Sequence, residues 1–148
     1  MTVVAVVGML SAVAIPAFMD YMKKSKKTEA AVQLNKLAKN LKVYVAINGE
    51  LPKGTAPLTP AEPCCRGAKA KCAVDPTGWQ QPVWHTLDFQ IDEPHLFQYR
   101  YHSDGKTAVV EAVGDLDCDT TMITYRLDVT SSNGNPTAII TEPAPNTD

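Results

Sequence analysis

The opening stretch, residues 1–30, reads MTVVAVVGMLSAVAIPAFMDYMKKSKKTEA. Its first nineteen residues contain no charged side chain, and Asp20 is the first ionisable one. In helical form these nineteen residues span about 28 Å, close to the roughly 30 Å core of a bilayer. A cleavable signal peptide would need a basic segment before the apolar run and a small-residue cleavage site after it, and the sequence shows neither. Helices buried in soluble proteins rarely stay uncharged for this long. Residues 1–19 therefore predict a membrane-inserting helix.

The helical pattern continues beyond the apolar segment. Residues 20–48 are rich in Lys, Ala, Leu and Gln, which favour helices. Apolar residues recur there at helical spacing: Val32, Leu34, Leu37, Ala38, Leu41 and Val45. Pro16 removes one backbone hydrogen bond and predicts a kink or local opening, and Gly49 predicts the end of the helix. We expect one helix of roughly 45 residues, near 70 Å long, whose amphipathic half at residues 20–48 packs on a soluble domain.

Charge divides the chain into two unlike parts. Residues 1–48 hold seven Lys and two acids, a net charge of +5, whereas residues 49–148 hold seven basic and fourteen acidic residues, a net charge of −7; together these give −2. A uniformly basic nucleic-acid binder is therefore disfavoured. The 148 residues amount to about one domain, which rules out an enzyme with separate cofactor and substrate domains. An apolar, basic start followed by an acidic body indicates an anchored or assembled protein.

Residues 49–148 form the expected globular head. Six of the eleven prolines fall between Pro52 and Pro82, so residues 49–95 predict a long loop. Beyond this loop apolar residues alternate, which predicts four strands, at residues 96–101, 107–113, 121–130 and 137–141. Sequential strands with short connections form an antiparallel meander with one apolar face. We expect an α+β fold, with the long N-terminal α-helix packed on a four-stranded antiparallel sheet over residues 96–141 and a loose tail at residues 142–148.

Catalytic motifs are missing from the sequence. There is no GxSxG, P-loop or GxGxxG pattern, and His85, His95 and His102 lack metal-binding spacing. The aromatic residues of the head indicate core packing rather than a binding platform; they include Trp79, Trp84, Phe89, Phe97, Tyr99 and Tyr101. We therefore expect that the chain is not an enzyme.

The start of the chain resembles the N-terminal helix of type IV pilins and of the pseudopilins of type II secretion. The matching residues are Gly8, Ala14-Ile15-Pro16-Ala17-Phe18, Tyr21, Ser25 and Glu29-Ala30. The match covers about thirty residues, and the stretch GWQQPVWHTLDFQIDEPHLFQYRY is more loosely similar to pilin-like proteins of delta-class bacteria. Mature chains of the family begin with an N-methylated aromatic residue and Thr-Leu-Ile-Glu-Leu, upstream of a Met like Met1. The resemblance therefore implies a native start upstream of Met1.

The resemblance implies a structural subunit of a type IV pilus-like filament. Gly8, Pro16, Phe18 and Tyr21 would then act in helix bending and assembly. The expected partners are copies of the chain, other pilins and the pilus assembly machinery, with the inner membrane holding the precursor before export to an extracellular pilus. The KKSKK cluster alone would place residue 20 onward in the cytoplasm, whereas the family exports this side. The alternatives are a periplasmic pseudopilin of type II secretion and a membrane-anchored periplasmic binding domain that never polymerises.

Four cysteines, Cys64, Cys65, Cys72 and Cys118, predict two disulfides in an exported domain. Because the adjacent pair Cys64 and Cys65 does not readily bond to itself, two pairings remain. One joins Cys64 to Cys72 and Cys65 to Cys118; the other joins Cys65 to Cys72 and Cys64 to Cys118. Either pairing ties the Pro-rich loop to the sheet. Zinc is the alternative, but the paired CxxC motifs of structural zinc sites are missing.

Charged clusters offer two further candidate sites. Asp115, Asp117 and Asp119 alternate as at the start of a calcium loop, and some pseudopilins hold calcium in a loop of the sheet domain. Calcium is therefore a possible cofactor. The alternative is a solvated turn, because Thr120 and Tyr125 stand where a complete calcium loop has Gly and Glu. Lys23, Lys24, Lys26 and Lys27 could meet anionic headgroups or DNA, but a solvated face at the membrane border is favoured, and nucleic acid is not an expected partner.

Overall fold

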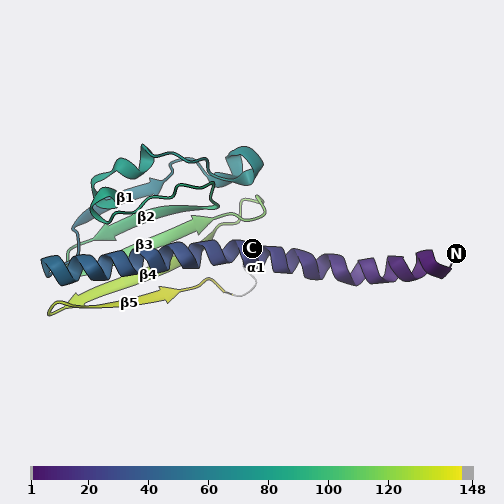
Figure 1. The fold of residues 1–148 in the computed structure, drawn as a ribbon, viewed down its shortest axis with the longest axis horizontal. Coiled ribbons are helices and arrows are strands. Elements are labelled where there is room, and N and C mark those ends of the chain that lie inside the picture. The colour runs from purple at the N-terminus through teal and green to yellow at the C-terminus, as the bar shows by residue number, and fades with distance from the viewer. Residues whose placement is uncertain (1, 145–148) are drawn as a thin grey trace.

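The computed structural model describes residues 2–144 and, within them, all side chains except those of residues 2–13, 16, 17, 19 and 20. Its first element, α1 (Thr2–Asn48), is a single helix of 47 residues (Figure 1). It passes through Pro16 uninterrupted, so the expected opening there does not divide it. The helix ends at Gly49, which has a φ of +80° and donates its N–H to the carbonyl of Val45 at 2.8 Å. The predicted long helix is confirmed.

The sheet contains five antiparallel strands that neighbour one another in chain order. They are β1 (Gly54–Thr59), β2 (Phe97–Ser103), β3 (Thr107–Gly114), β4 (Ile123–Ser132) and β5 (Asn135–Thr141). Strands β2–β5 are the predicted meander, and each lies within two residues of its expected bounds. The β4–β5 hairpin closes through Asn133 and Gly134, both at positive φ, as a two-residue turn of type I′ requires. The α+β class and the packing of a helix on an antiparallel sheet are confirmed.

The prediction of a four-stranded sheet with residues 49–95 as loop is wrong in one respect, because β1 adds a fifth strand from this segment. It pairs with β2, Ala56 lying opposite Tyr101, and the register shifts between Ala56 and Thr59, where Pro57 lies. Proline lacks the N–H of a ladder hydrogen bond and is therefore confined to edge strands and bulges. In GTAPLT only Ala56 and Leu58 alternate, and Pro57 lies between them, so the pattern was too short to predict this strand.

The rest of the Pro-rich segment folds as short helical turns rather than as open loop. These are η1 (Cys64–Arg66), η2 (Ala68–Ala70), η3 (Gly78–Gln80) and α2 (Pro82–Thr86). They bring Trp79, Trp84 and Phe89 over β2, where the Trp79 ring lies 5.7 Å from that of Trp84 and 6.2 Å from that of Tyr99, measured between centroids. The indole N–H of Trp84 donates to the hydroxyl of Thr59 at 3.0 Å. The expected packing role of these aromatic residues is confirmed.

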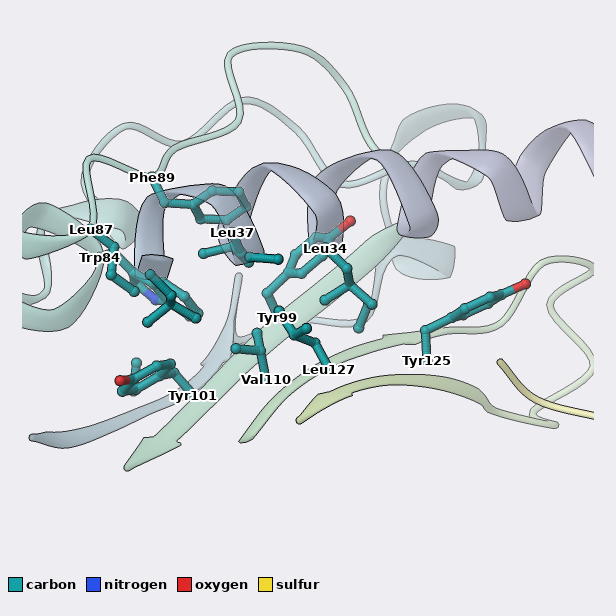
Figure 2. Close-up of a cluster of buried hydrophobic side chains, with 14 of the residues drawn as sticks. Leu34, Leu37, Trp84, Leu87, Phe89, Tyr99, Tyr101, Val110, Tyr125 and Leu127 are labelled. Carbon is teal, nitrogen blue, oxygen red and sulfur yellow. The ribbon is translucent and has the colours of Figure 1, made fainter. Parts of the chain in front are cut away.

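The core lies between one face of the sheet and two covering segments. Helix α1 contacts β3, β4 and β5, and the aromatic residues of the Pro-rich segment cover β2. Figure 2 shows Leu34 and Leu37 of α1 directed at side chains from β2, β3 and β4. Among the described side chains of α1, the buried ones are those of Ala30, Leu34, Leu37, Ala38, Leu41 and Val45, whereas Val32 faces solvent. The core therefore fixes the second half of α1 to the sheet and leaves its first half outside.

Candidate assembly helix and the stapled end of the head

The first half of α1 extends beyond the head, which we define as residues 49–144 (Figure 1). Among its described side chains, Ile15 and Phe18 are 60% and 64% exposed, and Tyr21 and Met22 are also exposed. Residues 15, 18 and 22 lie three and four positions apart, so they share one face of the helix. The side chain of Pro16 and the surroundings of Gly8 lie outside the described residues. Phe18 and Tyr21, predicted assembly residues, are thus available for contact.

A membrane span was predicted at residues 1–19. Within the part of the chain whose side chains the structure describes, no helix is both long and apolar enough to cross a bilayer. Most side chains of residues 1–19 lie outside that description.

The outward face of α1 alongside the head carries three exposed aliphatic side chains among exposed lysines such as Lys36 and Lys39. Val32, Val43 and Ile47 are all more than half exposed, with Ile47 reaching 77%. Val43 and Ile47 border a shallow groove of about 250 Å³ between the end of α1 and the segment after α2, where Leu87 and Asp88 form the opposite wall. The amide nitrogen of Asn40 closes the base of this groove by donating to the carbonyl of Leu87 at 2.9 Å. The sequence pattern had placed Val32 in the core, but the structure exposes it on the same side of α1 as Lys36 and Lys39.

Glu29 joins α1 to the start of β2. One of its carboxylate oxygens accepts the backbone N–H of Leu96 at 2.8 Å. Burial raises the pKa of Glu29 above its ordinary value, although that hydrogen bond and the neighbouring His95 act in the opposite direction. Burial likewise raises the pKa of the nearby Tyr99, with a further contribution from the charge of Glu29. Glu29 is the only acid between residues 21 and 48, a signal that could have singled it out.

Two disulfides staple the end of the head from which α1 emerges. Cys64 bonds to Cys72 and Cys65 bonds to Cys118, which decides between the two predicted pairings. The short loop closed by the first bond is tight at Gly67, where an added Cβ would lie 1.8 Å from the carbonyl oxygen of Lys71. The second bond ties this loop to the β3–β4 connection. We call residues 64–72 and 115–120 together the stapled end.

Two lysines of α1 hold the stapled end against the helix. The ammonium group of Lys23 pairs with the carboxylate of Asp117 at 3.1 Å, and that of Lys26 donates to the carbonyl of Leu116 at 2.6 Å. The Leu116 side chain is itself buried in the core. The basic cluster expected at a membrane border therefore contributes at least two of its members to contacts within the chain. Sequence spacing alone could not reveal these contacts, because 94 residues separate Lys23 from Asp117 and 90 separate Lys26 from Leu116.

The three predicted calcium ligands lie together, with carboxylate oxygens of Asp115, Asp117 and Asp119 within 4.8 Å of one another. The oxygens of Asp115 accept the backbone N–H groups of Cys118, Asp119 and Thr120, at 2.7, 3.2 and 3.0 Å. Asp117 pairs with Lys23, and Asp119 accepts the N–H of Thr121. Backbone N–H groups and Lys23 thus already contact these carboxylates. This arrangement is typical of the strand-connecting turn that we gave as the alternative to a calcium site. Calcium stays a prediction.

Cys64, Cys72 and His95 also lie within 4.8 Å of one another. Both sulfurs are committed to a disulfide, so they cannot act as thiolate ligands of a metal. Comparison with known proteins gave no match to a family model, a curated protein or a solved structure.

Proposed function

We propose that the chain is a structural subunit of a type IV pilus-like filament that assembles through α1. The observation that carries this proposal is the half of α1 that extends past the head with Ile15, Phe18 and Met22 exposed on one face. Contiguous exposed apolar side chains mark a contact with a membrane or another protein. The resemblance of residues 1–30 to pilin helices supplies the class of assembly.

The physical basis of assembly is an exchange of apolar surroundings. Before assembly, residues 1–19 would lie in the inner membrane as an anchor. During assembly the same side chains would leave lipid and pack against α1 helices of neighbouring copies, so little apolar surface meets water at either stage. Gly8 and Pro16 would ease local bending as the helix moves.

The second half of α1 supports the same proposal from the receiving side. Val43 and Ile47 form an exposed apolar pair at the end of α1, and the groove beside them is open to a neighbour. A contact between the projecting half of one helix and the head-bound half of another joins two different surfaces. Such head-to-tail contacts generate closed rings when the rotation between copies closes, and open helical filaments when it does not. The acidic heads would form the outer wall of an extracellular pilus, with other pilins and the assembly machinery as further partners.

The experiment that tests the proposal begins with filaments sheared from cells of the source organism. N-terminal peptide and intact mass spectrometry on this fraction should detect the chain, with a mass gain of four hydrogens on reduction from the two disulfides. Absence of the chain from sheared filaments, together with its recovery from membranes, would refute the filament and favour an anchored domain that does not polymerise. Recovery only from short periplasmic filaments would instead favour a pseudopilin of type II secretion.

A matched pair of variants tests the role of the projecting helix face. Phe18→Ser removes an exposed aromatic side chain from that face, whereas Phe18→Leu keeps it apolar. We expect Phe18→Ser to abolish or strongly reduce sheared filaments while Phe18→Leu retains them, with equal amounts of both chains in the membrane. Equal filament yields from the two variants would contradict assembly through this face.

A further inference from the structure

The stapled end has a position along α1 that can be compared with the layers of a bilayer. It contacts α1 at Lys23 and Lys26, and this is the end of the head that faces the projecting half of the helix (Figure 1). Granting the proposed anchor, residues 1–19 fill the hydrocarbon core. At about 1.5 Å per residue, Lys23 then lies about 6 Å beyond the core and Lys26 about 10 Å beyond it. The headgroup region on each side is about 5–8 Å thick, so the stapled end lies at its outer boundary.

The loop at this level is basic in an otherwise acidic head. Residues 49–148 contain seven basic residues, and three of them, Arg66, Lys69 and Lys71, lie exposed in the loop closed by the Cys64–Cys72 bond. Arg66 pairs with Glu62, and the charge of Lys71 acts on Glu29 across the loop. Lys69 has a φ of +59° and lies at the exposed turn of the loop.

The three aspartates at the same end all have partners within the chain. Asp117 pairs with Lys23, Asp115 accepts three backbone N–H groups and Asp119 accepts the N–H of Thr121. The disulfide and the close approach at Gly67 hold the loop in a compact shape. Little conformational freedom is therefore left for this loop to lose when its cations meet a surface.

We propose that this disulfide-closed basic loop rests on anionic lipid headgroups while the subunit is anchored in the membrane. The inference depends on the proposed anchor and adds a defined contact between the head and the bilayer surface. In this arrangement Lys69 and Lys71 would face the lipid phosphates, while Lys23 and Lys26 hold the stapled end against α1. A basic residue near an anionic bilayer surface contributes about 1 kcal/mol, a factor of about five, and the contribution fades within a Debye length of about 8 Å at physiological salt. The contact holds the head upright and releases it when the helix is extracted.

The test uses the full chain reconstituted into two kinds of vesicle, one of phosphatidylcholine alone and one with about a third phosphatidylglycerol. Flotation first shows whether the chain associates with neutral bilayers. A water-soluble amine-acetylating reagent then labels the lysines, and mass spectrometry gives the rate at each site. Lys39 on α1 and Lys106 in the β2–β3 turn are internal controls, because Lys39 lies about 20 Å along the helix from Lys26 and Lys106 lies at the opposite end of the head.

We expect Lys69 and Lys71 to be labelled at least about threefold more slowly on the anionic vesicles at low salt, with the difference lost at high salt, while Lys39 and Lys106 are unchanged. Flotation on both vesicles with equal labelling of Lys69 and Lys71 would overturn the headgroup contact and leave the anchor intact. Failure to float with neutral vesicles would overturn the anchor itself. Protection of these lysines in sheared filaments but not on anionic vesicles would assign the loop to a subunit contact and overturn the inference.

Discussion

The two disulfides are expected to stabilise the head unequally, because they close loops of very different length. Their sequence separations are 8 residues for Cys64–Cys72 and 53 residues for Cys65–Cys118. The loop-closure relation then gives about 2.5 kcal/mol for the short loop and about 4 kcal/mol for the long one at 25 °C. Packing complicates a direct comparison, since Cys64 and Cys72 are buried whereas Cys118 is exposed.

Two single-disulfide variants separate the constraint from the packing. Cys64→Ala/Cys72→Ala keeps the long bond, and Cys65→Ala/Cys118→Ala keeps the short one. Each is unfolded in urea with and without reductant, so that reduction removes one covalent link while the thiols remain in place. Fluorescence of Trp79 and Trp84, both in the core, reports unfolding in detergent solution.

Reduction should lower the free energy of unfolding by about 4 kcal/mol in the variant that keeps the long bond and by about 2.5 kcal/mol in the other. Equal losses, or a larger loss on reducing the short bond, would refute the loop-length reasoning. The urea dependence of the free energy gives a separate check, because a changed slope signals a changed denatured state.

Two further predictions concern single side chains. Burial raises the pKa of Glu29 in the folded state. The protonated Glu29 therefore stabilises the folded chain at acidic pH, and this stabilisation is lost as the pH rises through the folded-state pKa. Glu29→Gln can still accept the N–H of Leu96 but does not titrate, so it should be at least as stable as the wild type at pH 7 and lose this relative advantage on acidification. Urea unfolding of both chains at several pH values measures this, and a wild type that gains on the variant as pH rises would contradict it. Gly67→Ala should cost about 1–3 kcal/mol, because its Cβ meets the carbonyl oxygen of Lys71, whereas Gly78→Ala, whose Cβ stays 3.2 Å or more from its neighbours, should cost less. Comparable melting temperatures for these two variants would argue against the tight loop.

Local periodicity was sufficient to predict the elements with regular patterns. Leu34, Leu37 and Leu41 recur at helical spacing and are fully buried. The alternation of Tyr125, Leu127 and Val129 likewise placed β4, whose odd positions face the core. In these segments the local pattern and the final packing agree, so the sequence alone was informative.

Features that depend on distant partners could not be predicted in the same way. Strand β1 exists because its backbone pairs with β2, and the short pattern of GTAPLT, interrupted by Pro57, does not predict that pairing. The choice between two disulfide pairings required the position of Cys118 relative to Cys65 in space. The contact of Lys23 with Asp117 likewise joins segments whose proximity only the folded chain establishes.

The lengthwise packing of α1 on the head has a mechanical consequence. A tensile force applied along the helix axis would act in shear on the contacts from Ala30 to Val45, loading them together rather than one after another. The load would pass next into the antiparallel sheet and into the covalent link between Cys65 and Cys118, which bridges the segment after β1 and the β3–β4 connection. Forced rupture is governed by the unfolding rate rather than by equilibrium stability, so the unfolding rate under load is the quantity that this geometry would affect.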